Sequence, residues 1–366
     1  MTARAYLRPV GRVTLPPDRI HTSADRLLRL AGRDDLQFVG LELLERRSGG
    51  SPDRRVLTTD ELIALTSQPD VRGRHLAEIV ARLCRPRAPL AGLTFDRPRI
   101  MGVVNVTPDS FSDGNLFFRP EDAIAHGLRL EEAGADILDI GAESTRPGAD
   151  PVPLDEELGR IMPVIEGLVG RTNARISVDT RKAEVMRRAA IAGVHMLNDV
   201  SALTHDPASL EVAIETGLPV VLMHALGDPR TMQNDPRYDN VLLDVYDWLE
   251  ARVAACVTAG LARERLFVDP GIGFGKTAAH NLELITGASL FQGLGCSVLL
   301  GASRKRFIGT LTGTSDPAAR VHGSIAAALA GVMQGAQIVR VHDVSETRQA
   351  LSIWEAVTTG AVQPTV

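Results

Sequence analysis

The chain has 366 residues, 44% hydrophobic and 23% charged, which is enough for a full-sized buried core and a further small domain. Its 40 basic and 45 acidic residues give a formal net charge of -5, which argues against a nucleic-acid partner because no general positive field exists. Three cysteines lack metal-ligand spacing and lie in aliphatic surroundings, which predicts free thiols in a reducing compartment: Cys84, Cys256 and Cys296. No signal peptide is readable, and polar residues and glycines interrupt the longest uncharged stretch, residues 321–339, so we expect a cytoplasmic protein without a membrane span.

Residues 1–95 differ in pattern from the remainder of the chain. Arginines are frequent, the apolar segments are short, and residues 47–55 have the composition of a loop. His75–Cys84 has helical periodicity, and the proline-containing segment 85–89 predicts a linker after it. No catalytic chemistry can be assigned here, so we interpret residues 1–95 as a small packing or interface extension of unknown role.

Apolar runs alternate with helical patterns in the second predicted domain, residues 96–366. Eight runs have the length of strands: residues 100–106, 137–143, 176–180, 196–200, 220–224, 266–270, 297–303 and 338–343. Helical patterns lie between them, including residues 120–133, 154–169, 182–192, 207–216, 241–259 and 320–333. A glycine just past several of these helices is expected to take a left-handed conformation: Gly134, Gly193, Gly217, Gly260 and Gly335.

This order of elements predicts an α/β fold, a (β/α)8 TIM barrel preceded by a small N-terminal extension. In such a barrel the polar residues at the strand ends would meet at the carboxyl rim, where these enzymes keep their chemistry. A doubly wound open sheet is the alternative, but it would scatter the polar strand ends away from its single crevice.

Polar side chains stand at the ends of several predicted strands. The first run ends at Asn105 and hands over to a loop rich in ligand-type side chains, residues 107–114. Asp179 and Asn198 hold comparable positions on adjacent strands, whereas the default role of Asp199 is a helix cap. Carboxylates and amides that converge on one rim suit a ring with hydrogen-bond donors and acceptors, because analogues would leave buried polar groups unpaired.

The glycine-rich segment Asp269–Thr277 is not a nucleotide-binding loop. A P-loop needs glycine at the position of Pro270, and the dinucleotide fingerprint needs a small residue at the position of Lys276. The glycines would let the backbone approach a ligand closely, although glycines alone also suit a flexible connection. The acid Asp269 before a loop with Phe274 and Lys276 favours a ligand site.

Strong cations mark the last two predicted strands. Ser303–Arg306 follows the seventh strand, and Arg340 and His342 alternate within the apolar eighth strand, so they share one side of it. Barrels commonly hold phosphate in the loops after these strands, and arginine supplies bidentate geometry, so a phosphate site is favoured over a solvated basic edge. His195 and His224 lack metal-ligand spacing and are interpreted as structural.

Together these motifs resemble the dihydropteroate synthase family. In chain order they are Asn105-Val-Thr-Pro-Asp-Ser-Phe-Ser-Asp113, Thr145-Arg-Pro-Gly148, Ser177-Val-Asp-Thr180, Asn198-Asp-Val200, Asp269-Pro-Gly-Ile-Gly-Phe-Gly-Lys276, Ser303-Arg-Lys305 and Arg340-Val-His-Asp343. The resemblance spans residues 99 to 357 and leaves residues 1–95 outside it. It implies a transferase that joins 6-hydroxymethyl-7,8-dihydropterin diphosphate to p-aminobenzoate, with loss of diphosphate, in folate biosynthesis.

The resemblance also implies roles for individual residues. The pterin diphosphate would be bound by Thr145, Asp179, Asn198, Asp269, Lys305, Arg340 and His342. p-Aminobenzoate, which sulfonamides imitate, would be bound by Phe111, Thr145, Arg146, Pro147, Phe274 and Arg306. Asn105 would bind the cofactor Mg2+, and the catalytic residues would be Asp113, Lys305, Arg340 and His342. The family further implies small-molecule substrates as the partners, and a homodimer.

The expected chemistry agrees with these residue types. Loss of diphosphate leaves a pterin-stabilised cation at the methylene carbon, so Arg340, His342 and Mg2+ would stabilise the leaving group as its charge develops. A single protein oxygen from Asn105 suffices for Mg2+ when phosphate supplies other ligands. Asp113 would stabilise the cation or take the amine proton. Arg306 departs from the small hydroxyl residue usual in the family, and it would either bind the p-aminobenzoate carboxylate or block the pocket.

Two other functions are compatible with parts of the pattern. A corrinoid-dependent methyltransferase that uses a folate would share the pterin-binding residues, but it has no need for the cationic diphosphate site. A non-catalytic paralogue that binds pterin or serves an assembly role is the second alternative, supported by Arg306 and by the N-terminal extension.

Overall fold

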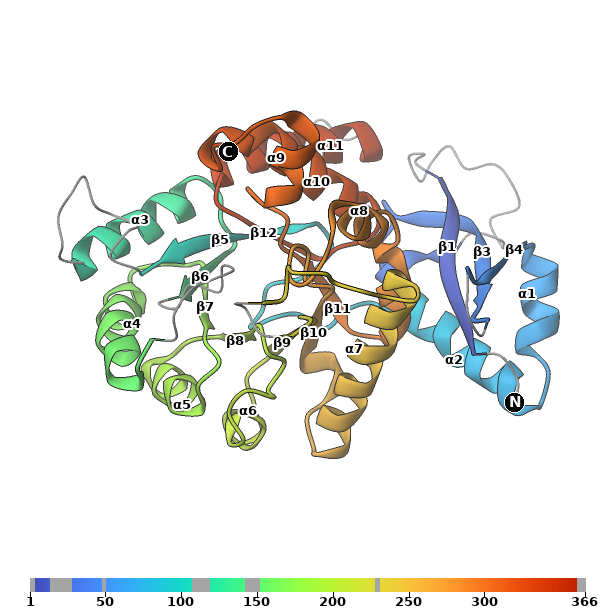
Figure 1. Ribbon diagram of the computed structural model, residues 1–366, viewed down its shortest axis with the longest axis horizontal. Helices are drawn as coiled ribbons and strands as arrows, with labels where there is room; N and C mark the ends of the chain where they lie inside the picture. The colour runs from blue at the N-terminus through green and yellow to red at the C-terminus, as the bar shows by residue number, and fades with distance from the viewer. Residues whose placement is uncertain are drawn as a thin grey trace.

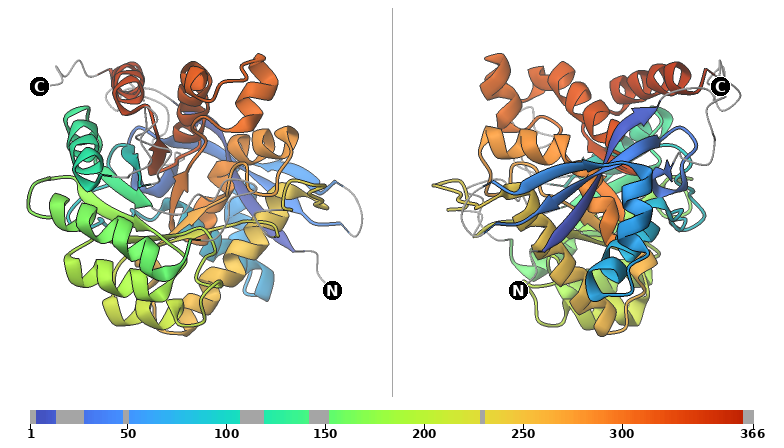
Figure 2. Two further views of the ribbon diagram at one scale, coloured as in Figure 1. Left: turned by 60° about the vertical axis from the view of Figure 1, so that its left-hand side comes forward. Right: turned by 90° about the vertical axis from the view of Figure 1, so that its right-hand side faces the viewer.

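The computed structural model describes residues 4–13, 28–47, 51–106, 119–141, 152–227 and 231–360. Within these ranges the chain forms a small sheet with helices before residue 85 and a closed barrel that begins at Arg99 (Figure 1). The sheet lies across one side of the barrel, as the two views of Figure 2 show.

The N-terminal part is a four-stranded antiparallel sheet with two helices. Its elements are β1 (Ala5–Val13), β2 (Leu28–Arg29), η3 (Leu30–Gly32), β3 (Gln37–Glu45), β4 (Asp53–Leu57), α1 (Thr59–Thr66) and α2 (Val71–Cys84). β3 has β1 along one edge and β2 and β4 along the other. α2 starts at the cap Asp70, whose carboxylate accepts from Gly73 N at 2.6 Å, and packs Leu76, Ile79 and Leu83 into a core shared with the sheet. The prediction of a loop over residues 47–55 is wrong for residues 53–55, because β4 begins at Asp53.

The N-terminal part is joined to the outside of the barrel by polar contacts. Tyr6 donates its hydroxyl hydrogen to the carboxylate of Asp247 at 2.9 Å. The segment 85–89, predicted as a linker, is held in place because Arg87 Nη2 donates to the main-chain oxygen and to Oε1 of Gln292 at 2.9 and 2.8 Å. Burial lowers the pKa of Arg87 to about 10, which reflects how completely this guanidinium is enclosed.

Eight parallel strands close into a barrel in the order β10-β11-β12-β5-β6-β7-β8-β9. They are β5 (Arg99–Asn105), β6 (Ile137–Gly141), β7 (Arg175–Asp179), β8 (Met196–Asp199), β9 (Val220–Met223), β10 (Leu266–Asp269), β11 (Ser297–Leu300) and β12 (Ile338–Val341). Every predicted strand is present, and the (β/α)8 fold is confirmed. The open-sheet alternative is wrong, because β9 and β10 are paired and close the ring.

Helices surround the barrel. They are α3 (Pro120–Glu132), α4 (Leu154–Leu168), α5 (Ala183–Ala192), α6 (Ser209–Thr216), α7 (Val241–Thr258), α8 (Ala278–Thr286), η6 (Ala288–Leu294), α9 (Arg306–Thr312), α10 (Val321–Met333) and α11 (Val344–Thr359), with short 3-10 turns η5 (Arg263–Arg265) and η7 (Ala318–Arg320). The six predicted helices are present, whereas α8, α9 and α11 were not singled out by their patterns. The five predicted glycine caps have φ angles from 60° to 115°, which confirms their left-handed conformation: Gly134, Gly193, Gly217, Gly260 and Gly335.

The amino-terminal end of the barrel is filled with apolar side chains. Residues from strands around the barrel meet those of the preceding segment there: Met101, Ile137, Met196, Val221, Phe267, Leu299 and Ile338 with Leu90 and Phe95. The rings of Phe95 and Phe267 lie edge to face with centroids 5.7 Å apart. Because this layer closes one end, the carboxyl end is left for a ligand.

Two expectations from composition can be compared with the structure. Cys256 and Cys296 are buried, Cys84 is partly buried, and all three are free thiols, as predicted. Residues 321–339 form α10 and the start of β12, and no helix within the described ranges has the length and apolarity to cross a membrane.

Candidate functional site

The carboxyl end of the barrel aligns polar residues from neighbouring strands. Strand pairing places Asn105 beside Gly141, Gly141 beside Asp179, and Asp179 beside Asn198, so they form one row across β5 to β8. Glycine leaves room in this row, because a Cβ on Gly141 would lie 3.2 Å from the Cβ of Asp179 and would press on that side chain. Three of the predicted site residues are thereby brought to one rim.

Arg340 lies at the centre of a buried polar cluster. Its Nε atom donates to Asp139 Oδ2 at 2.6 Å, and its Nη2 atom donates to Asp179 Oδ2 at 2.8 Å. Asn198 Nδ2 donates to the same oxygen of Asp139 at 2.9 Å. One guanidinium therefore connects β12 with β6 and β7, and the cluster fixes the orientation of Asp179 and Asn198.

Asp139 is a site residue that the sequence motifs do not single out. It is fully buried within the apolar run Ile-Leu-Asp-Ile-Gly of β6. An acid in such a run was a readable signal, because carboxylates are rarely fully buried unless they are paired. Its Oδ1 atom has no hydrogen-bond partner among the residues that the structure describes. Such an orphan costs about 1–3 kcal/mol, so this oxygen is suited to accept an N–H from a ligand.

Two carboxylates of the site, Asp179 and Asp269, have raised pKa values. Burial raises the pKa of Asp179 to about 7 because removal from water disfavours the charged form by more than the neighbouring Arg340 favours it. The negative charge of Asp139 raises this pKa further. Burial also raises the pKa of Asp269, against the favourable charge of Lys305. Hydrogen-bond donors on a ligand would therefore stabilise carboxylates that the protein itself leaves poorly solvated.

The glycine-rich loop after β10 packs closely against other parts of the protein. Gly271 N donates to Asp269 Oδ1 at 2.7 Å, which orients the carboxylate at the strand end. Gly271, Gly273 and Gly275 have φ angles of 68°, 84° and 64°, a region that L side chains rarely adopt. A Cβ on Gly271 would lie 1.8 Å from the main-chain oxygen of His224. The glycines predicted to admit a ligand therefore also serve to pack this loop on the one after β9.

Lys276 holds the same loop from within. Its Nζ atom lies 2.9 Å from His224 Nδ1 and donates to the main-chain oxygen of Phe274 at 3.0 Å. Burial lowers the pKa of Lys276 to about 7, and burial together with the Lys276 charge lowers the pKa of His224 to about 2, so this imidazole is neutral. The structural interpretation of both histidines agrees with these contacts, since His195 Nδ1 accepts from Ile176 N at 3.0 Å.

Lys305 joins the seventh strand end to the glycine-rich loop. Its Nζ atom donates to the main-chain oxygen of Ile272 and lies 4.3 Å from the ring centroid of Phe274. Burial lowers the pKa of Lys305 to about 8, while the charge of Asp269 raises it. Asp269, Phe274 and Lys305 therefore belong to one site.

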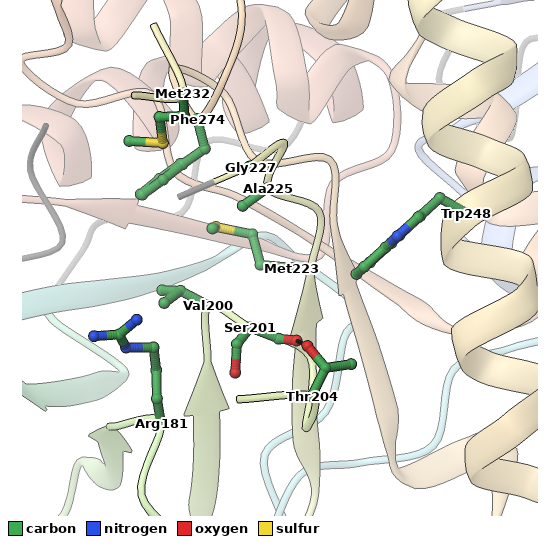
Figure 3. A pocket seen from close by; sticks show the side chains of 10 residues that line it. All are labelled: Arg181, Val200, Ser201, Thr204, Met223, Ala225, Gly227, Met232, Trp248 and Phe274. Atoms are coloured by element: carbon green, nitrogen blue, oxygen red, sulfur yellow. Dashed lines mark hydrogen bonds between the residues drawn. The ribbon is translucent and has the colours of Figure 1, made fainter. Parts of the chain in front are cut away.

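A cavity of about 140 Å³ lies beside Phe274 (Figure 3). It is lined by Arg181, Val200, Ser201, Thr204, Met223, Ala225, Gly227, Met232, Trp248 and Phe274. Met223, the last residue of β9, lies between Phe274 and Val200 in this view, with Trp248 of α7 at one side. Of these residues only Phe274 was predicted. The others lie on α7, at the end of β9 or past the ends of β7 to β9, and this position is the signal that would have found most of them.

The cations after β11 do not all face the site. Arg306 is the first residue of α9 and is exposed. Arg304 forms an ion pair in which its Nε atom donates to Asp343 Oδ2 at 3.1 Å. His342 Nδ1, just past β12, lies 3.0 Å from Ser303 Oγ. The predicted cationic group is thus divided between the site, an ion pair and an exposed helix start.

Five predicted site residues lie outside the described residues: Phe111, Asp113, Thr145, Arg146 and Pro147. The described ones that the structure brings to the carboxyl end of the barrel are Asn105, Asp179, Asn198, Asp269, Phe274, Lys305, Arg340 and His342. Arg306 stands apart from them in its exposure.

Comparison with known proteins identifies the class to which this barrel belongs. Residues 101–342 match the family described as pterin binding enzyme, so the chain belongs to the pterin binding enzymes. The dihydropteroate synthase of Escherichia coli K12 is 47% identical over 264 residues, which cover 72% of this chain and 93% of that protein.

Solved structures of dihydropteroate synthases are also similar to this chain. The Xanthomonas albilineans dihydropteroate synthase with 4-aminobenzoic acid matches with a TM-score of 0.71 and 51% identity, over 76% of this chain and 99% of that one. The same enzyme in complex with 7,8-dihydropteroate matches with a TM-score of 0.68 and 49% identity, over 76% and 100%. Within the pterin binding enzymes this chain belongs to the dihydropteroate synthase family, and it is a transferase, as the motifs predicted. The residues before 101 lie outside the family match.

Proposed function

We propose that this chain joins 6-hydroxymethyl-7,8-dihydropterin diphosphate to p-aminobenzoate, forming 7,8-dihydropteroate and diphosphate for folate biosynthesis. The observation that carries the proposal is the buried cluster of Asp139, Asp179, Asn198 and Arg340 at the open end of the barrel. Buried carboxylates would repel a phosphate, so the deep part of the site suits a neutral ring with N–H donors. An amide beside them adds the mixed donor and acceptor pattern that such a ring requires.

The pterin ring would lie against Asp179, Asn198, Asp269 and Lys305. The two carboxylates accept hydrogen bonds from ring N–H groups, and Asn198 can both donate and accept. Their burial supports this: Asn198 is 5% exposed and Asp269 is 6% exposed, so water has little access to them. A ligand that forms hydrogen bonds with them would remove the free-energy cost of leaving buried polar groups unpaired. The orphan oxygen of Asp139 offers one further acceptor at the same depth.

The chemical step breaks the bond between the methylene carbon and the diphosphate oxygen and forms a bond from the amine nitrogen of p-aminobenzoate to that carbon. The amine then loses a proton. Arg340, His342 and Thr145 would stabilise the negative charge of the departing diphosphate. Asp113 would accept the amine proton or stabilise the cation at the methylene carbon. Arg340 uses two of its five N–H donors on carboxylates and retains the others for the diphosphate.

Mg2+ is the implied cofactor, and the described residues restrict how it would be held. Within the described ranges no group of three or more His, Cys, Asp or Glu side chains could hold a metal ion. Asp139 and Asp179 are engaged by Arg340, whereas Asn105 stands at the rim in the same row as Asp179. One amide oxygen fits a hard cation that takes its remaining ligands from phosphate and water. Bound there, Mg2+ would offset the charge of the diphosphate.

p-Aminobenzoate would bind nearer the rim, against Phe274. Phe111, Thr145, Arg146 and Pro147 complete this proposed subsite from loops outside the described residues. Arg306 is exposed at the start of α9, and an exposed side chain does not fill a buried pocket. This supports the role in which Arg306 binds the substrate carboxylate from the rim over the role in which it blocks the pocket.

We further propose that the enzyme acts in the cytoplasm as a homodimer. Free thiols at all three cysteines support a reducing compartment. The dimer rests on the family alone, and sedimentation of the purified protein tests it directly: a monomer at all concentrations would exclude it.

The test of the reaction uses purified protein, both substrates and Mg2+, with dihydropteroate and diphosphate followed together. Lys305→Ala should abolish product, because it removes the cation between Asp269 and Phe274. Arg188→Ala, on the exposed face of α5, is the matched control and should keep full activity. Binding of the dihydropterin without any dihydropteroate would instead favour the binding paralogue. Methyl transfer without diphosphate release would favour the corrinoid-dependent enzyme.

A further inference from the structure

A second cavity lies between the N-terminal sheet and the outside of the barrel. Its volume is about 320 Å³, which exceeds the 140 Å³ beside Phe274 and falls within the range of about 300–1,000 Å³ for small-molecule sites. One wall comes from β1, η3 and the start of β3, and the other from the ends of α8 and α10 with η6. The cavity therefore exists only because the two parts of the chain meet.

The edge strand β1 forms much of this wall. It pairs only with β3 among the described strands, and it contributes Arg8, Val10 and Arg12 to the cavity. Gly11 between the last two has a φ of 66°, and a Cβ there would lie 2.5 Å from Val39 Cγ2. The strand thus has a left-handed residue at Gly11, a conformation that favours glycine, directly before Arg12.

Arg12 is a cation of this cavity without an ion-pair partner among the described residues. Arg8 is neutralised by Glu42, whose Oε2 atom lies 2.6 Å from its Nη2 atom. Arg12 Nη1 donates only to the main-chain oxygen of Met333 at 3.2 Å, and the guanidinium lies 5.3 Å from the ring centroid of Trp354. Its Nε and Nη2 atoms are buried and have no hydrogen-bond partner within the described ranges.

Ser289 on the barrel wall is a second unpaired group. The residue is 2% exposed, and its Oγ atom has no hydrogen-bond partner in the described part of the chain. An unpaired buried polar group costs about 1–3 kcal/mol, and native proteins hold few of them. Unpaired donors on both walls of one cavity therefore point to a ligand that accepts hydrogen bonds. Burial also lowers the pKa of Arg12, and the charge of Asp35 offsets this only in part.

We propose that this cavity binds a small organic monocarboxylate, with its carboxylate between Arg12 and Ser289. Arg12 forms no direct ion pair within the described residues, so its one guanidinium can take one negative charge, and its planar donors fit the two carboxylate oxygens. The aliphatic or aromatic body of the ligand would lie against Val10 and Phe38, which supply an apolar wall. The ligand would contact both the sheet and the barrel and so stabilise their contact. This site is separate from the pterin site and does not depend on the proposed reaction.

The test measures binding of three probes to the full-length protein by isothermal titration calorimetry: cyclohexanecarboxylate, its neutral analogue cyclohexylmethanol, and inorganic phosphate. The carboxylate should bind, while the alcohol and phosphate should bind at least about tenfold more weakly, since they lack either the charge or the apolar body. Arg12→Met should weaken carboxylate binding about tenfold or more. The matched control Arg55→Met, an exposed arginine on β4, should leave it unchanged.

Three results would overturn the proposal. These are no carboxylate binding to the unmodified protein, equal binding to Arg12→Met, or phosphate binding as tight as that of the carboxylate. If circular dichroism shows that Arg12→Met does not fold, Ser289→Ala takes its place. That substitution removes only the unpaired hydroxyl, so it should weaken carboxylate binding without loss of fold, and unchanged binding would again reject the site.

Discussion

The substitution Asp139→Asn removes the charge that holds Arg340 and Asn198 together while nearly keeping the shape of the side chain. A hydrogen bond to a charged group contributes about 1.5–3 kcal/mol, and removal of one partner of a buried ion pair costs about 3–5 kcal/mol. Arg340 keeps its second carboxylate, Asp179, at 2.8 Å, so the loss should lie near the lower figures. We expect the free energy of unfolding to fall by about 2–3 kcal/mol.

The same substitution should shift the pH profile of the reaction. If Asp179 binds the pterin as a carboxylate, as proposed, kcat/KM for the dihydropterin diphosphate should rise with pH through about 7 in the unmodified enzyme. Because the negative charge of Asp139 raises this pKa, its removal should move the acid limb to lower pH. For stability the sign is opposite: the folded pKa lies above the ordinary 3.8, so ionisation of Asp179 weakens the fold as pH rises from 3.8 to about 7.

Thermal unfolding and steady-state kinetics over a pH series would measure both effects. The matched control is Asp136→Asn, which removes a buried carboxylate from ion pairs with Arg99 at 3.2 Å and Arg348 at 2.8 Å, near the start of β6. It should destabilise the fold without moving the acid limb. If Asp139→Asn lost stability but kept the acid limb of the unmodified enzyme, the electrostatic coupling between Asp139 and Asp179 would be refuted.

Three further substitutions test the rim and its loops. Arg306→Ser should alter the KM for p-aminobenzoate and spare that for the pterin substrate; unchanged steady-state kinetics would place Arg306 outside the pocket. Gly271→Ala should cost more than the about 1–2 kcal/mol of a left-handed alanine, because its Cβ would lie 1.8 Å from a main-chain oxygen. Denaturant unfolding of Gly313→Ala, which has a φ of 73° but open space, supplies the reference, and equal losses would contradict the clash. Lys276→Met should raise the KM for p-aminobenzoate more than it lowers kcat, since Nζ holds the loop of Phe274; a fall in kcat alone would count against this positioning role.

The barrel could be predicted because its signals are local. Buried parallel strands are short, almost wholly apolar runs, and five of the helices between them end at a glycine cap that is readable from sequence. The N-terminal sheet has no comparable signal. β1 contains Pro9 and Gly11, residues that normally argue against a strand, and it exists because its pairing with β3 supplies what the local sequence lacks.

The site could be predicted where a motif lies at or just past the end of a strand. Asp179, Asn198 and Asp269 stand at such ends and are found from sequence. Asp139 lies two residues inside β6, and its role depends on Arg340, which is 201 residues further along the chain. Likewise, Arg304, Lys305 and Arg306 are adjacent cations in the sequence. Lys305, just before α9, contacts the glycine-rich loop, whereas Arg306, the first residue of α9, is exposed. Distances across a closed barrel are not encoded in any local pattern.

The charges of the site predict which ligand the proposed Mg2+ would help to bind. At the carboxyl end, the acids Asp139, Asp179 and Asp269 lie with the bases Lys276, Lys305 and Arg340. A neutral pterin can enter this set without changing its charge, but a diphosphate adds negative charge that the set cannot offset. Binding of 6-hydroxymethyl-7,8-dihydropterin should therefore be independent of Mg2+, whereas its diphosphate should bind more tightly when Mg2+ is present. Calorimetry of both ligands, with and without the ion, decides this: an equal response to Mg2+ would mean that the cation acts on the protein rather than on the diphosphate.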